Sequence, residues 1–172
     1  MRRIRYQVAC SLDGFIATAN DAFDWITPEP SFDFEAHLSQ FDTLLMGRRT
    51  FEIVRSMGET FPGKHVVVAS RSLRQADFPD VEIVSENLKE RVLELRMETG
   101  LDIWLYGGGK LFAQLLQWGL VDTVELAVIP VLLGGGVPMF PPNGTQYPLV
   151  LTKHRAYPSG MLLVEYDVKT GD

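Results

Sequence analysis

Strand-like and helix-like segments alternate along most of this 172-residue chain. Short apolar or β-branched runs, typical of buried strands, are followed by stretches with apolar residues at helical spacing. This order predicts an α/β fold with right-handed crossovers and a mostly parallel sheet. The predicted strands are residues 6–10, 15–17, 43–46, 64–69, 81–84 and 102–106, and the predicted helices are residues 31–40, 49–57, 88–98 and 110–118.

Two of these elements carry more specific predictions. The β-branched run of residues 66–68 is typical of a strand buried on both faces, and we expect it at the centre of the sheet. Ser31 is expected to cap the first helix, because its hydroxyl can accept from the N–H groups of the first turn.

The pattern changes after Asp122. Residues 123–129, 149–156 and 161–168 are all strand-like, and Pro158-Ser159-Gly160 joins the last two as a hairpin. The sheet is therefore predicted to be mixed, with an antiparallel C-terminal end. Because no repeat, linker or low-complexity tract interrupts the chain, we expect residues 1–172 to form one domain.

Composition excludes several classes of function. The net charge is −6 and no basic run is present, so nucleic acid is not an expected partner. No apolar stretch reaches the roughly 20 residues of a membrane span, and the basic N-terminus lacks the apolar core of a signal peptide, which favours a cytoplasmic location. Cys10 is the only cysteine, so neither an internal disulfide nor a structural metal site is expected.

Ligands of open α/β sheets bind beyond the carboxyl ends of the strands, and three such ends are unusual here. The first carries Gly107-Gly108-Gly109 between a strand and a helix. Consecutive glycines let the backbone approach a ligand, and a helix N-terminus attracts anions, so this end is a candidate diphosphate site. A turn that requires positive φ would account for one or two of the glycines, but three favour anion binding.

The other two ends are basic and hydroxyl-rich. Gly47-Arg48-Arg49-Thr50 follows one strand and Ser70-Arg71-Ser72 follows another. Either cluster alone is more often a solvated surface, but together they indicate a second anion. A diphosphate site and a second anion site match a dinucleotide with a 2′-phosphate, so NADPH is the expected cofactor rather than NADH.

Four stretches resemble a known family. Residues 9–17, 46–52 and 106–112 look like the signature stretches of dihydrofolate reductase-like proteins, in the same order. Residues 129–140 are most similar to the C-terminal reductase domain of the riboflavin-biosynthesis deaminase-reductase and to its stand-alone bacterial relatives. The resemblance implies a dihydrofolate reductase-like three-layer α/β/α fold and a homodimer.

The resemblance also implies a function. The expected activity is an NADPH-dependent reductase acting on a small heterocyclic substrate, most like 5-amino-6-(5-phosphoribosylamino)uracil reductase or an unassigned relative. The alternatives are dihydrofolate reductase activity, or nucleotide binding without catalysis. A deaminase is excluded because the H-x-E and P-C-x-x-C zinc signature is missing.

Cofactor contacts follow from the same resemblance, position by position. The nicotinamide is expected beside Val8, Ala9, Cys10, Ile16 and Ala17, and the phosphates beside Arg48, Arg49 and Thr50. The 2′-phosphate is expected beside Ser70 and Arg71, and the diphosphate beside Gly107, Gly108, Gly109, Lys110 and Leu111. Gly47, Ser72 and Tyr106 are further expected cofactor contacts. For Cys10, a small buried core residue is favoured over a redox role.

The resemblance to folate reductases, which place a carboxylate in the first turn of the helix after the aromatic loop, implies a proton source at that position. Asp33 and Glu35 are the candidates, although acids there also complement the helix dipole. Trp25-Ile26 replaces the Trp-Pro of folate reductases, which favours a riboflavin-type reductase.

Asp13 is interpreted as a turn residue. The substrate phosphate could use Lys153, His154 and Arg155, which otherwise face solvent on an edge strand.

Overall fold

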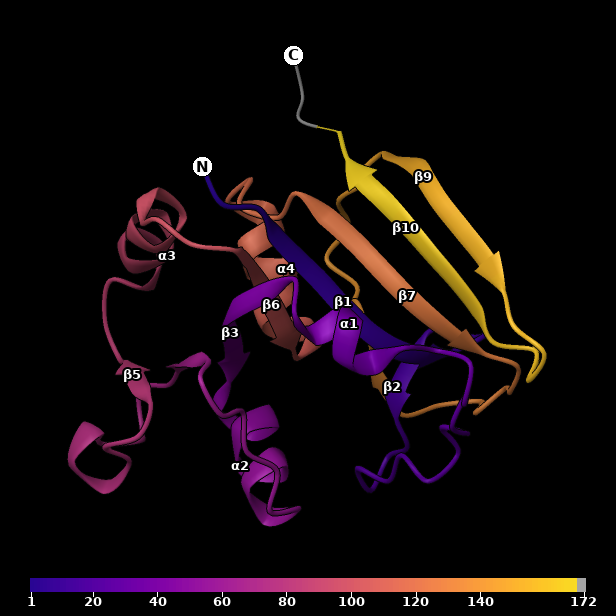
Figure 1. Ribbon diagram of the computed structural model, residues 1–172, viewed down its shortest axis with the longest axis horizontal. Helices are drawn as coiled ribbons and strands as arrows, with labels where there is room; N and C mark the ends of the chain where they lie inside the picture. The colour runs from indigo at the N-terminus through magenta and orange to yellow at the C-terminus, as the bar shows by residue number, and fades with distance from the viewer. Residues whose placement is uncertain (170–172) are drawn as a thin grey trace.

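The computed structural model describes residues 1–169 and is built on one eight-stranded sheet (Figure 1). The strand order is β5-β4-β3-β6-β1-β7-β10-β9, with a separate two-stranded pair of β2 and β8. Six neighbouring strands are parallel: β1 (Ile4–Ser11), β3 (Phe41–Gly47), β4 (His65–Ala69), β5 (Glu82–Val84), β6 (Asp102–Gly107) and β7 (Thr123–Ile129). The antiparallel strands are β9 (Leu149–Ala156), β10 (Leu162–Val168), β2 (Phe15–Ala17) and β8 (Val137–Pro138).

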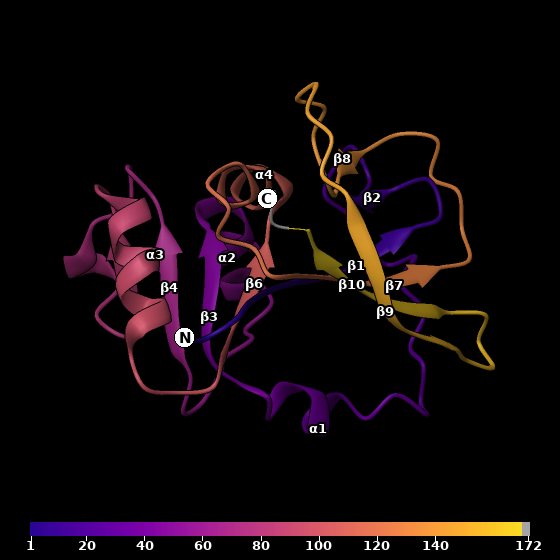
Figure 2. The ribbon, with the colours of Figure 1, turned by 90° about the horizontal axis from the view of Figure 1, so that it is seen from above.

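Helices cover both faces of the parallel part (Figure 2). Helices α3 (Leu88–Met97) and α4 (Gly109–Gln117) pack on one face, where Tyr6, Leu45 and Leu105 contribute to the buried cluster. Helices α1 (Phe34–Leu38) and α2 (Arg48–Ser56) lie on the other, over Phe41, Leu44 and Trp104. The predicted three-layer α/β/α arrangement with an antiparallel C-terminal hairpin is confirmed. A 3-10 turn, η1 (Gln75–Asp77), lies between β4 and β5. Within residues 1–169, no helix is long and apolar enough to cross a membrane.

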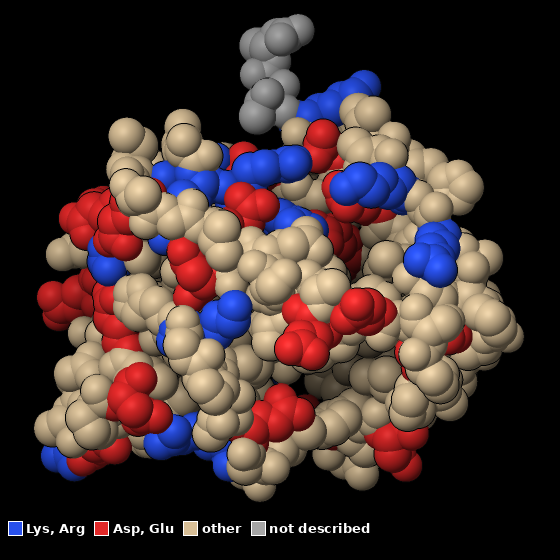
Figure 3. Space-filling model, viewed as in Figure 1, with Lys and Arg blue, Asp and Glu red and all other residues tan. Residues whose placement is uncertain are grey.

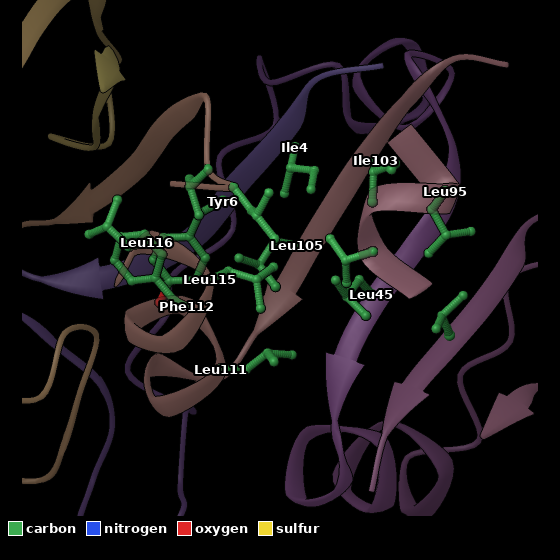
Figure 4. Packing of buried hydrophobic residues seen from close by; sticks show 14 of the residues in the cluster. Ile4, Tyr6, Leu45, Leu95, Ile103, Leu105, Leu111, Phe112, Leu115 and Leu116 are labelled. Atoms are coloured by element: carbon green, nitrogen blue, oxygen red, sulfur yellow. The ribbon is translucent and has the colours of Figure 1, made fainter. Parts of the chain in front are cut away.

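The packing of α4 on β1 joins the first strand to the glycine turn. Figure 4 shows Tyr6 beside Phe112, with Leu115 and Leu116 nearby. The Tyr6 and Phe112 rings stack with centroids 3.7 Å apart, and Tyr6 has no exposed surface. Burial of large apolar side chains contributes about 1.5–3 kcal/mol each, so this contact fixes the start of α4 against the centre of the sheet.

Two sequence predictions need correction, and one strand was missed. The first helix begins after Asp33, whose side chain accepts from the N–H of Ala36, rather than after Ser31, and it ends at Leu38. The valine run of residues 66–68 is buried, but its strand β4 lies next to the edge strand β5 rather than at the centre. Strand β8 was not predicted, because two residues carry no readable period.

His37 anchors the short helix α1 to the sheet. The side chain is buried, its Nε2 contacts Oε1 of Gln7, and its ring lies 5.4 Å from that of Phe41 and 5.9 Å from that of Trp104. Burial, reinforced by the positive charge of Arg5, lowers the pKa of His37 to about 4. The ring is therefore neutral at pH 7 and packs as part of the core.

This burial predicts a pH dependence of stability. Between pH about 6.5 and about 4 the unfolded chain binds a proton at His37 that the folded chain does not, so stability falls as pH drops through this window. We expect His37→Gln to remove about 2 kcal/mol of the loss in unfolding free energy between pH 7 and pH 4.5, measured by urea denaturation. The exposed His154→Gln is the control and should leave the loss unchanged; equal losses in wild type and His37→Gln would contradict the assignment.

Candidate active site

Two helix N-termini open side by side at the carboxyl edge of the sheet. Strands β3 and β6 are parallel neighbours, and a Cβ added to Gly47 would lie 3.9 Å from the carbonyl oxygen of Gly107. Gly47 is the N-cap of α2 and Gly108 the N-cap of α4, and a glycine has no side chain to accept from the first turn. The N–H groups at both helix starts are therefore available to an anion, and both dipoles favour one there.

Two of the three glycines, Gly107 and Gly109, have a structural reason to be glycine. Gly107 has φ +138°, and the Gly107–Gly108 peptide bond is cis. A Cβ on Gly109 would lie 2.6 Å from the Pro138 carbonyl oxygen and 2.7 Å from that of Met139, so Gly109 is required by packing. At Gly108 the nearest atom to an added Cβ is Oγ1 of Thr50, at 3.5 Å. The run by itself is thus weaker support for an anion site than the sequence indicated, and the paired helix starts carry that argument instead.

The arginines of this edge are exposed and weakly held. Arg48 pairs with Glu52 one turn along α2, at 3.2 Å, and Arg49 pairs with Asp21 of the loop over residues 18–30. Their side chains are 53% and 65% exposed. Surface pairs of this kind contribute about 0–1 kcal/mol, so both guanidinium groups can turn to a phosphate at small cost. Lys110, at the start of α4, is also exposed.

The third strand end adds another arginine to this edge. Ser70 is buried, and its Oγ accepts from the N–H groups of Ser72 at 3.3 Å and Leu73 at 3.1 Å. These bonds fold the turn after β4 and leave Arg71 and Ser72 exposed. Ser70 shapes the turn, and Arg71 is the group best placed to meet an anion in solvent.

The nicotinamide side of the predicted site lies along β1 and β2. Val8, Ala9, Ile16 and Ala17 are half-buried, while Cys10 is buried. Burial raises the pKa of Cys10 to about 11, which keeps the thiol protonated and agrees with the core interpretation. In the view of Figure 1, Figure 3 shows a hollow between α1 and α2, beside the segment that carries β2. The structure thus brings this hollow to the same edge as the two helix starts.

The predicted acids belong to α1, and acidic side chains gather over this helix along the rim of the hollow (Figure 3). Both Asp33 and Glu35 are exposed. Oδ1 of Asp33 accepts from the N–H of Ala36 at 2.9 Å, which is the capping role described for such acids. The bond uses one carboxylate oxygen, so capping and proton donation are compatible at Asp33.

The basic residues of β9 border a different recess. Lys153, His154 and Arg155 line a groove of about 600 Å³ on the far side of α1 from the hollow, in the view of Figure 3. Its floor is the buried pair of Arg5 and Glu125, in which Arg5 Nη2 donates to Oε2 at 2.9 Å. Sequence reasoning missed this pair; the signal was Arg5 and Gln7 alternating with apolar residues along β1. The β9 cations are therefore poorly placed to hold a substrate in the hollow.

Among residues 1–169, no group of three or more His, Cys, Asp or Glu side chains could hold a metal ion. The chemistry of this edge is instead that of backbone N–H groups, guanidinium groups and exposed carboxylates.

Comparisons with known proteins agree with this architecture. The chain is 32% identical over 178 residues to the uncharacterized protein YyaP of Bacillus subtilis, covering 96% of this chain and 94% of that protein. The crystal structure of a protein from Shewanella sp. PV-4, named "Putative riboflavin biosynthesis protein", superposes with a TM-score of 0.84 at 27% identity, over 98% of this chain and 99% of that one.

A larger protein shares the fold. The diaminohydroxyphosphoribosylaminopyrimidine deaminase/5-amino-6-(5-phosphoribosylamino)uracil reductase of Thermotoga maritima gives a TM-score of 0.72 at 18% identity, over 98% of this chain and 57% of that one. A family model described as the RibD C-terminal domain matches residues 2–163. This chain, with its dihydrofolate reductase-like fold, therefore belongs to the RibD C-terminal domain family.

Proposed function

We propose that this chain is an NADPH-dependent reductase whose cofactor lies across the carboxyl edge of the sheet. The observation that carries the proposal is the pair of helix starts at Gly47 and Gly108, which present uncapped N–H groups side by side, with the exposed Arg48 and Arg49 in the first turn of α2. The family supports a reductase, since one structural neighbour is named as a uracil-derivative reductase. When bound, NADPH would supply the hydride.

Different residues at this edge would bind different parts of NADPH. The first turns of α2 and α4 would hold the diphosphate, and Arg71, beyond β4, would hold the 2′-phosphate. Val8, Ala9, Ile16 and Ala17 offer a half-buried surface to the nicotinamide, which limits water there. Fixed orientation of cofactor and substrate would account for much of the rate.

The proposed substrate is a phosphoribosyl-substituted pyrimidine, bound in the hollow between α1 and α2. Reduction of its ribosyl group delivers a hydride to carbon, and the electron pair released onto the neighbouring heteroatom takes up a proton. Asp33 or Glu35, at the rim of the hollow, would supply that proton.

The cofactor assignment predicts a selective binding defect. Arg71→Ala should weaken NADPH binding about tenfold or more and leave NADH binding unchanged, because a hydrogen bond to a charged group contributes about 1.5–3 kcal/mol. Titration followed by tryptophan fluorescence measures both. Arg3→Ala is the control: Arg3 is also an exposed arginine, but it precedes β1 and so lies at the amino edge of the sheet, away from the proposed site. If wild type binds neither nucleotide, the reductase proposal is wrong.

The proton-donor assignment predicts a loss of turnover without a loss of fold. Asp33→Asn retains an acceptor for the Ala36 N–H, and Glu35→Gln retains the size of the side chain, so neither should change the melting temperature by more than a few degrees. We expect one of them to lower kcat by about a hundredfold or more, with 5-amino-6-(5-phosphoribosylamino)uracil as substrate and loss of NADPH absorbance as readout.

Glu90→Gln is the control for this experiment. Glu90 is an acid in the first turn of α3, on the opposite face of the sheet, and its variant should keep full activity. Full activity in both α1 variants would remove Asp33 and Glu35 from the mechanism. Turnover of dihydrofolate in place of the pyrimidine would instead assign the chain to folate reduction.

We also propose that the protein is a homodimer that uses β9. Every residue of this edge strand is exposed, and Leu149, Val150 and Leu151 are 40%, 44% and 49% exposed in succession. Apolar edge strands promote association unless they are covered, so a second copy is the expected cover. Leu151→Lys should convert a dimer to a monomer in light scattering, whereas Met97→Lys, at the exposed end of α3, should not; a monomeric wild type would contradict the proposal.

A further inference from the structure

The segment 130–140 connects the two ends of the proposed cofactor site. On one side it meets the β1–β2 turn: the Leu12 N–H donates to the Val131 carbonyl at 2.9 Å, and the Met139 N–H donates to the Gly14 carbonyl at 2.9 Å. On the other side, the Pro138 and Met139 carbonyls touch Gly109 at the start of α4. The position of this segment therefore sets the spacing between the proposed nicotinamide and diphosphate contacts.

The middle of the segment is a glycine loop with little to fix it internally. Gly134 has φ +71° and Gly136 has φ +141°, and a Cβ on Gly134 or Gly135 would meet nothing within 4 Å. Gly136 lies directly against the Ala17 carbonyl oxygen, beside the proposed nicotinamide. Because glycines lose the most conformational freedom on ordering, a loop of this kind is ordered only if residues outside it bind it.

The carboxylate of Asp13 binds the loop in this way. Its Oδ1 accepts from the N–H of Leu133 at 3.1 Å, and its Oδ2 accepts from the N–H of Gly134 at 2.8 Å. Oδ1 also accepts from Oγ of Ser11 at 2.6 Å, and that Oγ in turn accepts from the N–H of Phe15 at 3.0 Å. Hydrogen bonds to an ionised acceptor are roughly twice as strong as neutral ones.

The carboxylate is held in its charged form. The Ser11 hydrogen bond and the two backbone N–H groups lower the pKa of Asp13 from its usual value, although the side chain is exposed to solvent. The interpretation of Asp13 as a residue of its own turn is therefore incomplete, since two of its three acceptor contacts reach a loop about 120 residues away in the sequence.

We propose that Asp13 is a positioning residue of the reductase site, which holds the glycine loop of residues 133–136 against the β1–β2 turn and so sets the width of the cofactor cleft. This inference rests on the proposed function. Asp13 does not touch the reacting atoms; it acts through Gly136, which lies against Ala17, and through Met139, which lies against Gly109. Loss of the carboxylate should loosen the loop and weaken cofactor binding while the sheet stays folded.

The experiment compares wild type, Asp13→Asn and Asp13→Glu. Asn keeps the size and one acceptor oxygen but places an NH₂ group against an N–H donor. We expect the Leu133 and Gly134 amides to lose at least tenfold of their protection in hydrogen exchange, and the Kd for NADPH to rise about tenfold. The amides of β1 and β6 should keep their protection, which separates positioning from unfolding. Asp13→Glu should restore part of the affinity, because it restores the second acceptor.

Asp24→Asn is the matched control, since Asp24 is an exposed acid in the next loop along the chain, and both of its readouts should equal those of wild type. If wild type binds NADPH and Asp13→Asn binds it equally well, the positioning role is overturned while the reductase proposal stands. If protection is lost across the whole sheet, Asp13 is a stability residue and the inference is also overturned. If wild type does not bind NADPH, the proposed function itself fails, and hydrogen exchange at residues 133–134 then reports only on the loop.

Discussion

Tyr6 holds together the three parts of the molecule on which the proposed site depends. Its ring is fully buried in β1 and stacks on Phe112 of α4, and its hydroxyl donates to the Met139 carbonyl at 3.0 Å. One side chain therefore links the central strand, the helix after the glycine turn and the segment 130–140. Desolvation raises the pKa of the phenol well above its usual value, so the hydroxyl remains a donor at neutral pH. Its rigid ring makes the glycine turn part of the core rather than a mobile surface loop.

Much of the fold could be predicted because the strands are strongly patterned. Strands buried on both faces need continuous apolar or β-branched runs, and residues 66–68 and 103–105 supply them. The start of α1 could not be predicted, because Ser31 and Asp33 are both good caps and local chemistry does not separate them. Packing decides between them: His37 packs against the rings of Phe41 and Trp104, and this contact favours the helix phase in which Asp33 is the cap. The pair of β2 and β8 depends on contacts between residues about 120 positions apart, which a local pattern does not record.

The edge of the sheet that carries the candidate site could be predicted from the sequence. The contacts that require particular residues there, such as Gly109 and Asp13, could not. The rule for open α/β sheets located the ends at Gly47, Ser70 and Gly107 from strand positions alone. The run of three glycines was weaker evidence for an anion site than the sequence analysis assumed. Gly109 is required by packing, because a Cβ there would collide with the carbonyls of residues 138–139. The second role of Asp13 was missed because Asp-Gly is a common turn. Its carboxylate also accepts from the N–H groups of Leu133 and Gly134, which are about 120 residues away in the sequence and leave no local signal.

The charge distribution is compatible with the proposal that this acidic protein binds an anionic cofactor. The net charge of −6 would oppose a dinucleotide only if it acted at long range, and the Debye length of about 8 Å at physiological ionic strength confines most of that repulsion to near neighbours. Arg48, Arg49 and Arg71 follow the strand ends, together with the positive ends of two nine-residue helices, so an anion bound there would have positive groups nearby. The acids of α1 stand across the hollow from these groups. Such a site can bind a phosphate on the side of α2 and hold an acid on the side of α1. Because water and salt screen distant charges, each side is affected mainly by the charges nearest to it.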